Sequence, residues 1–231
     1  MSAHKTLPAP GQTALLFANG FSLSDLQRFG SVYGSSSPSY VLMSALDAVR
    51  DYMEGEGTAL YRQTARLVDG LRQRWPSLRS RDGLQLDPAR LTLHSSDGFA
   101  LAEALRARGA YPEMADRGHV VCILTCADGK TELSRLERAL TETALTGSAA
   151  AFPSPPEMPK AARTPRQALF ASRETIPLTG SAGRISACQI APYPPGVPVI
   201  APGELIEKKH LAYLMEIGYN KGYCHVISRE E

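Results

Sequence analysis

Between about Ala89 and Leu145 the chain alternates strand-like and helical patterns, and this alternation constrains its fold more than any other feature. RLTLHS and HVVCILTCA are short apolar runs typical of strands. They are followed by GFALAEALRARG and TELSRLERALTETAL, whose apolar residues have helical spacing. Strands separated by helices of this length indicate a small sheet with helices on one side. We therefore expect an α/β fold.

Further elements are expected before this unit. Residues 15 to 18 form a short apolar run that predicts a strand, and Ser24 is placed to cap a helix after it. A longer helix is expected after Pro38 and should end at Gly55 and Gly57. Its apolar stripe would consist of Val41, Leu42, Ala45, Leu46, Val49 and Met53.

Another helix is expected from about Thr58 to Trp75, where Pro76 would stop it. Residues 147 to 167 contain five prolines and no periodicity, so we expect an extended connection there. Beyond it the sequence predicts a short strand in RISACQI, a proline-rich loop, a helix from about Lys208 to Ile217 and a final strand.

Charge and hydropathy narrow the possible partners. The 231 residues include 25 basic and 23 acidic side chains, for a net charge of +2. Such a balance predicts no binding to nucleic acid or to an anionic membrane. No apolar run approaches the roughly 20 residues that span a bilayer, and the first residues lack the pattern of a signal peptide. We expect a soluble cytoplasmic protein.

The four cysteines do not have the spacing of a metal site. Cys122 and Cys126 would lie about 13 Å apart on one strand, which is too far for a disulfide or for shared binding of one metal ion. Cys188 is remote in sequence, and Cys224 has only His225 beside it. We expect four reduced, buried thiols and no metal.

The segment SAHK, residues 2 to 5, is the first candidate for chemistry. A lysine next to a histidine and a hydroxyl residue can act as a Schiff-base amine when its surroundings favour the neutral form. The alternative is that Lys5 is an ordinary solvated lysine near an end of the chain.

Three segments in order resemble one family. SAHKTLP…QTALL is similar to the pyridoxal-phosphate lysine segment of the bacterial ornithine/lysine/arginine decarboxylases, which have the aspartate-aminotransferase-like fold type I. SSSPSYVLMSALDAVRDYM resembles the segment that follows it in that family. GRISACQIAPYPPGVPVIAPGE resembles the family's C-terminal signature and is the most specific of the three.

The resemblance implies a cofactor site. Lys5 would bond covalently to pyridoxal 5'-phosphate, while Ser2 and His4 would donate hydrogen bonds to its phosphate. Ser36 and Ser37, with Ser35, would reach the phosphate of the partner subunit's cofactor, which implies a dimer. The alternative for this serine cluster is a simple helix cap.

Glu204 is a candidate substrate-binding residue. The family's substrates end in an amine or a guanidinium, and the prolines before Gly196 and Gly203 predict two turns that would hold the Glu204 carboxylate over a cleft. The alternative is a surface glutamate at the start of a helix.

The resemblance also implies an organisation. Residues 1–88 would be the end of the cofactor-binding large domain, 89–146 a small α/β subdomain, 147–167 a linker and 168–231 the C-terminal decarboxylase domain. The chain would be the C-terminal fragment of a basic amino-acid decarboxylase of polyamine metabolism. It would act as a homodimer or with a missing N-terminal half, and we expect it to be inactive alone. The alternatives are an aminotransferase of the same fold and a non-catalytic partner of a full-length homologue.

Overall fold

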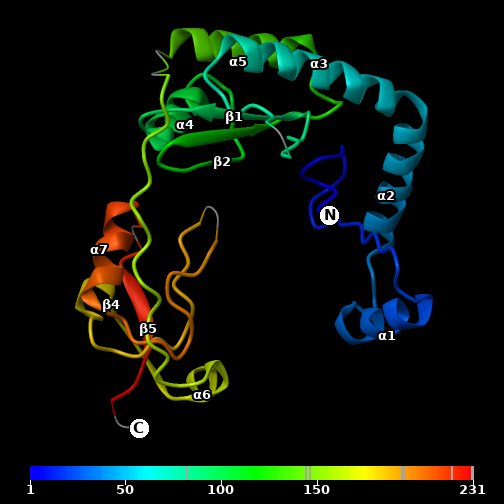
Figure 1. Ribbon diagram of the computed structural model, residues 1–231. Coiled ribbons are helices and arrows are strands. Elements are labelled where there is room, and N and C mark those ends of the chain that lie inside the picture. Colours follow the sequence, from blue (N-terminus) through cyan, green and yellow to red (C-terminus); the bar gives the residue numbers. More distant parts are fainter. Residues whose placement is uncertain (82, 144, 146, 194–195, 220, 230–231) are drawn as a thin grey trace. The chain divides into compact units, whose positions relative to one another are not determined.

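The computed structural model forms two compact units, an N-terminal unit and a C-terminal unit (Figure 1). The N-terminal unit comprises Met1–Ser95, Ala100–Glu113 and Val120–Gly147, and the C-terminal unit comprises Ser96–Phe99, Met114–His119 and Ser148–Glu231. The structure describes residues 1–81, 83–143, 145, 147–193, 196–219 and 221–229. The domain boundaries predicted at residues 88, 146 and 167 stay predictions.

Helices α1 (Leu23–Tyr33) and α2 (Tyr40–Tyr52) begin at serine caps. The cap of α1 is Ser22, whose Oγ accepts a hydrogen bond from the Asp25 amide at 3.1 Å, so the prediction of Ser24 was wrong. The strand predicted at residues 15 to 18 is also absent. The only pairing there, among the described residues, is a single antiparallel bridge between Ser2 and Ala14.

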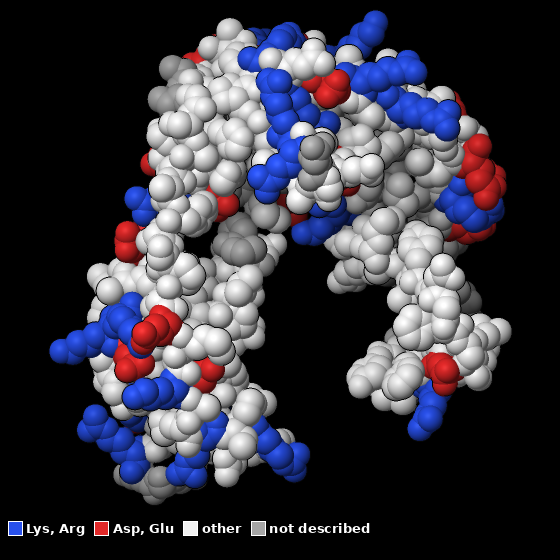
Figure 2. Space-filling model, in the orientation of Figure 1, with Lys and Arg blue, Asp and Glu red and all other residues white. Residues whose placement is uncertain are grey.

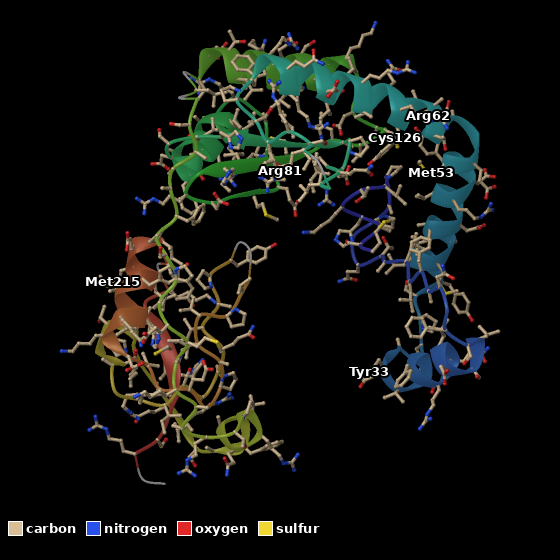
Figure 3. All side chains as sticks on the ribbon, viewed as in Figure 1. Tyr33, Met53, Arg62, Arg81, Cys126 and Met215 are labelled. Carbon is tan, nitrogen blue, oxygen red and sulfur yellow. The ribbon has the colours of Figure 1, made fainter. Side chains whose placement is uncertain are left out.

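Gly55 and Gly57 do not end α2 in a loop. The chain continues through a π-helical segment, η1 (Met53–Gly57), into α3 (Thr58–Arg74). Gly55 departs from helical geometry, with φ −83° and ψ −115°, so the two helices meet at a kink. A Cβ at Gly57 would lie 2.8 Å from the Met53 Sδ, and that sulfur is 3.9 Å from the Cys126 Sγ (Figure 3). The glycine therefore allows close packing at the kink.

The predicted α/β arrangement is confirmed. Strands β1 (Arg90–His94), β2 (Met114–Ala115) and β3 (His119–Ile123) form a sheet of order β1-β3-β2, accompanied by α4 (Gly98–Arg106) and α5 (Lys130–Glu142). Alternate residues of β1 and β3 are buried, as expected for strands with one face on a core. The fully buried large side chains of these elements are Leu91, Leu93, Leu105, Val120 and Leu140.

The C-terminal unit has a core of its own. Strands β4 (Arg173–Pro177) and β5 (Tyr223–Ile227) pair antiparallel, with α6 (Pro165–Phe170), η2 (Leu178–Gly180) and α7 (Lys208–Glu216) around them in the sequence. Helix α7 and strand β5 confirm the predicted helix and final strand. The strand predicted in RISACQI was wrong, because that segment makes only isolated bridges. The core consists of Leu178, Ile190, Ile200, Ile206, Leu211, Leu214, Cys224 and Val226.

The cysteines match their predicted burial with one exception. Cys122, Cys126 and Cys224 are buried, but Cys188 is partly exposed. Strand β3 ends at Ile123, so Cys126 lies beyond it and not on the same strand as Cys122. Burial raises the pKa of the Cys122 thiol to about 12.

Helices α1 and α2 contain no buried residue, although both carry apolar side chains. Figure 2 shows the segment around α1 as nearly free of charged side chains on the face in view. Phe29, Val32, Tyr33, Tyr40 and Val41 are among the exposed large hydrophobic residues there. Exposed apolar surface on this scale is typical of a protein contact. None of the helices in the described ranges contains an apolar stretch that could span a bilayer.

Candidate active site

The candidate lysine lies on a short turn that is fixed from both sides. Ser2 bridges Ala14, and the Ala3 amide donates to the Thr13 carbonyl at 3.0 Å. The amides of Thr6 and Leu7 then both donate to the Ala3 carbonyl, at 3.1 and 2.8 Å, which closes the turn around residues 4 and 5. Ala3 is fully buried. These hydrogen bonds therefore fix the backbone of the segment that carries Ser2, His4 and Lys5.

Ser2 and His4 contact each other. The Ser2 Oγ lies 3.1 Å from the His4 Nδ1, and that nitrogen lies 3.1 Å from the Thr13 carbonyl oxygen. Because a carbonyl only accepts hydrogen bonds, the contact with Thr13 requires a hydrogen on Nδ1. The Ser2 hydroxyl hydrogen can then be donated to an outside acceptor. A hydroxyl and an imidazole placed in this way suit a phosphate.

Lys5 pairs with a residue that the sequence did not predict for the site. Its Nζ donates to the Glu113 Oε1 at 2.5 Å, and the two side chains are 39% and 28% exposed. Glu113 immediately precedes β2 and is 108 residues away in sequence. No local pattern links two residues so far apart, so sequence spacing provides no signal for this pair.

Ser36 and Ser37 lie in the exposed segment between α1 and α2. The Ser37 amide donates to the Ser35 Oγ at 3.1 Å, but α2 is capped by Ser39. The simple cap role considered for the serine cluster was therefore wrong. Among the contacts of the described residues, none joins Ser36 or Ser37 to the Lys5 turn.

Glu204 lines a cavity of about 740 Å³ in the C-terminal unit. Its Oε2 accepts from the Ala201 amide at 2.7 Å, and its own amide donates to the Ala201 carbonyl. The carboxylate thus closes its own turn at the cavity wall. Much of the wall is apolar, with Phe99, Phe152, Val199, Tyr213 and Ile217 among its residues.

Glycines set the backbone before Glu204. Gly203 has φ +90° and Gly196 has φ +88°, a region that favours glycine. The Gly196 amide donates to the Pro192 carbonyl at 2.8 Å, which is consistent with a turn at that point. The predicted contribution of Pro194 and Pro195 to this turn lies outside the described residues.

Another acidic residue at the cavity is held by an ion pair. The Glu157 carboxylate lies 3.0 Å from the Lys209 ammonium, and this hydrogen bond lowers the pKa of Glu157. Lys209 also lies 3.4 Å from a Glu207 oxygen. The carboxylates of Glu157 and Glu204 therefore both have partners within the chain.

Comparison with known proteins relates this chain to one group of decarboxylases. Residues 144–220 match the family model of the Orn/Lys/Arg decarboxylase C-terminal domain. Arginine decarboxylase from Bacillus subtilis (strain 168) is 30% identical over 239 residues, covering 93% of this chain and 49% of that protein. Constitutive lysine decarboxylase from Escherichia coli (strain K12) is 46% identical over 63 residues, covering 26% of this chain and 8% of that protein.

Solved structures agree in fold. Constitutive lysine decarboxylase from E. coli superposes with a TM-score of 0.74 at 20% identity, covering 98% of this chain and 49% of that one. Lysine decarboxylase from Francisella novicida gives a TM-score of 0.71 at 19% identity, covering 98% and 48%. The chain thus spans about half the length of these relatives. Residues 144–220 match the Orn/Lys/Arg decarboxylase C-terminal domain, and the chain as a whole resembles the C-terminal portion of these decarboxylases.

Proposed function

We propose that this chain carries the cofactor lysine of a pyridoxal-phosphate-dependent decarboxylase that acts on arginine, lysine or ornithine in polyamine metabolism. The observation that supports it most is the turn of residues 2 to 7, which brings the Ser2 hydroxyl and the His4 imidazole within 3.1 Å of each other and carries Lys5 next to them in the chain. These groups suit the phosphate and the aldehyde of pyridoxal 5'-phosphate. When bound, that cofactor supplies the electron sink for the carbon that loses CO₂.

Each residue of the turn has a distinct role in this proposal. Lys5 forms the covalent bond to the cofactor aldehyde. Ser2 donates its hydroxyl hydrogen to the phosphate, and His4, with a hydrogen on both ring nitrogens, donates from Nδ1 to the Thr13 carbonyl and from Nε2 to the phosphate. The buried backbone at Ala3 limits the movement of all three, so the lysine and the phosphate ligands stay in register.

Glu204 is proposed to recognise the terminal amine or guanidinium of the substrate. Its Oε2 is engaged by the Ala201 amide, which fixes the direction of the carboxylate and leaves Oε1 for the cation. Replacing Glu204 by Gln in an active enzyme should raise KM for the basic substrate more than it lowers kcat. An unchanged KM would contradict this role.

We propose that activity requires more polypeptide than this chain, either a second copy or the N-terminal half that the relatives contain. Two observations support this: the relatives are about twice as long, and α1 and α2 have no buried residue. In the dimer, Ser36 and Ser37 would reach the phosphate of the partner subunit's cofactor. The isolated chain should therefore release no CO₂ from arginine, lysine or ornithine.

The test has two stages. The chain is first incubated with pyridoxal phosphate, reduced with borohydride and digested, and the modified lysine is identified by mass spectrometry. Modification is expected at Lys5 and should be lost in Lys5→Arg, while Lys209→Arg serves as the control because Lys209 is equally exposed, at 39%. Preferential modification of Lys209 over Lys5 would overturn the proposal.

The second stage measures CO₂ release after co-expression with the N-terminal half of the B. subtilis arginine decarboxylase. Release that depends on Lys5 would support the decarboxylase. The exposed apolar side chains of α1 and α2 also favour a second candidate, a non-catalytic partner of a full-length homologue. Stable co-purification with such a homologue, without cofactor on Lys5, would favour that alternative.

A further inference from the structure

The ion pair between Lys5 and Glu113 brings a carboxylate onto the candidate cofactor amine. The Nζ and Oε1 atoms are 2.5 Å apart, a separation at which a proton can pass directly between them. Both side chains remain partly exposed, so a small aldehyde from solution can approach the amine. Nothing in the ARGAYPEMADRG segment suggests this role when it is considered by itself.

Both partners are held by their own backbones. Glu113 donates its amide to the Val121 carbonyl at 2.9 Å, which ties it to β3, and the preceding Pro112 is buried. Lys5 is held by the turn described above, closed by the Thr6 and Leu7 amides. The pair thus joins two segments that are already fixed, and a partly exposed pair of this kind contributes little to folding. The contact of the Glu113 carboxylate with the Lys5 amine is therefore better explained by a role in the reaction of that amine than by a contribution to the stability of the fold.

We propose that Glu113 is the positioning residue of Lys5, holding its amine in place and carrying its proton when the amine reacts with an aldehyde. The inference rests on the proposed function, because the aldehyde is that of pyridoxal phosphate. The Lys5 ammonium first gives one proton to the Glu113 carboxylate, which leaves a neutral amine. The nitrogen lone pair then forms a bond to the aldehyde carbon as the C=O electron pair moves to oxygen.

The protons balance over the complete reaction. The oxygen leaves as water after taking one proton back from Glu113 and one from the nitrogen. A protonated C=N bond remains on Lys5, and the Glu113 carboxylate is restored. No oxidant, reductant or other reactant is needed.

Two rates measured on the full chain test this role. The first is acylation of Lys5 by trace acetic anhydride, followed by mass spectrometry, which needs no cofactor. Loss of the carboxylate in Glu113→Gln removes an interaction that favours the ammonium, so acylation of Lys5 should rise at least about threefold. The second is formation of the borohydride-fixed bond to pyridoxal phosphate, which should become slower in the same variant because the proton carrier is gone.

The opposite changes expected in the acylation rate and in the rate of bond formation distinguish a Glu113 that carries the proton from one that only restrains the amine. If Glu113 only restrained the amine, both rates would rise together, and that result would overturn the inference. Glu113→Asp keeps a carboxylate and should restore part of the rate of bond formation. Glu157→Gln is the matched control, since it removes a carboxylate from Lys209 and should leave both rates at Lys5 unchanged.

The two proposals fail differently. If the unmodified chain forms the bond at Lys5 and Glu113→Gln forms it equally fast, only the role of Glu113 is wrong. If the unmodified chain forms no bond at Lys5 with pyridoxal phosphate even when co-expressed with the N-terminal half of a relative, both proposals are overturned. Far-UV circular dichroism of each variant verifies that the fold is retained.

Discussion

Substitution of Gly203 by Ala should destabilise the C-terminal unit more than the same change at another glycine with positive φ. A Cβ at Gly203 would clash with the Arg163 carbonyl oxygen and lie 3.2 Å from the Thr164 carbonyl oxygen. Both atoms belong to the backbone, so neither can rotate away. The Gly203 carbonyl also accepts from the amides of Ala162 and Arg163, at 2.9 and 3.0 Å.

The loss in free energy of unfolding expected for Gly203→Ala has two contributions. An L-residue in this region of φ costs about 1–3 kcal/mol. Moving the Arg163 backbone away disrupts two hydrogen bonds, each worth about 1 kcal/mol. Gly203→Ala should therefore lower the free energy of unfolding by about 3–5 kcal/mol. Gly183 has φ +81° with open space around its Cβ position, so Gly183→Ala should lose only the first contribution.

Native-state hydrogen exchange measures both losses in one unit of the chain. The slowest amides of β4 and β5 report opening of the C-terminal unit, and a difference of about 2 kcal/mol between the variants corresponds to roughly 30-fold faster exchange in Gly203→Ala. Equal exchange in the two variants would refute the reasoning, because it would mean that the Arg163 backbone moves without cost.

Two other predictions concern the cores. Leu214 is fully buried while its neighbour Met215 is 65% exposed (Figure 3), so Leu214→Ala should cost about 2–5 kcal/mol in urea unfolding and Met215→Ala almost nothing; similar losses would contradict the assigned face of α7. Burial raises the Cys122 pKa from 9.0 to about 12, which lowers the fraction of thiolate at pH 8 about 1000-fold. Iodoacetamide should therefore label the partly exposed Cys188 and leave Cys122 unlabelled until the chain unfolds. Labelling of Cys122 in the native chain, followed by mass spectrometry, would show that its strand opens locally.

Local patterns predicted the elements whose side chains alternate between core and solvent. Strands β1 and β3 and helices α4 and α5 were expected because their apolar residues follow one period throughout. Strand β4 has no such period, since its sequence RETIP is mostly exposed and it is defined by pairing with β5 about fifty residues later. The kink at Gly55 escaped prediction for a related reason. Glycine permits both a helix end and a kink within a continuous helical segment, and the close contacts that a Cβ at Gly57 would make with Met53 and Tyr52 arise only in the folded chain.

The candidate site likewise contains residues that are close in sequence and one residue that is distant in sequence. Ser2, His4 and Lys5 are close in sequence and lie on one turn, so a short motif was enough to identify them as a group. Glu113 enters the site from the edge of a different element, and its contact with Lys5 exists only because the sheet and the turn are both formed. A motif can therefore indicate the proposed nucleophile, Lys5, whereas the carboxylate proposed to carry its proton is identified only from the tertiary fold. Since the pair is partly exposed, changes at Glu113 should be followed through the reactivity of the Lys5 amine, which responds directly to the carboxylate, and not through the stability of the chain.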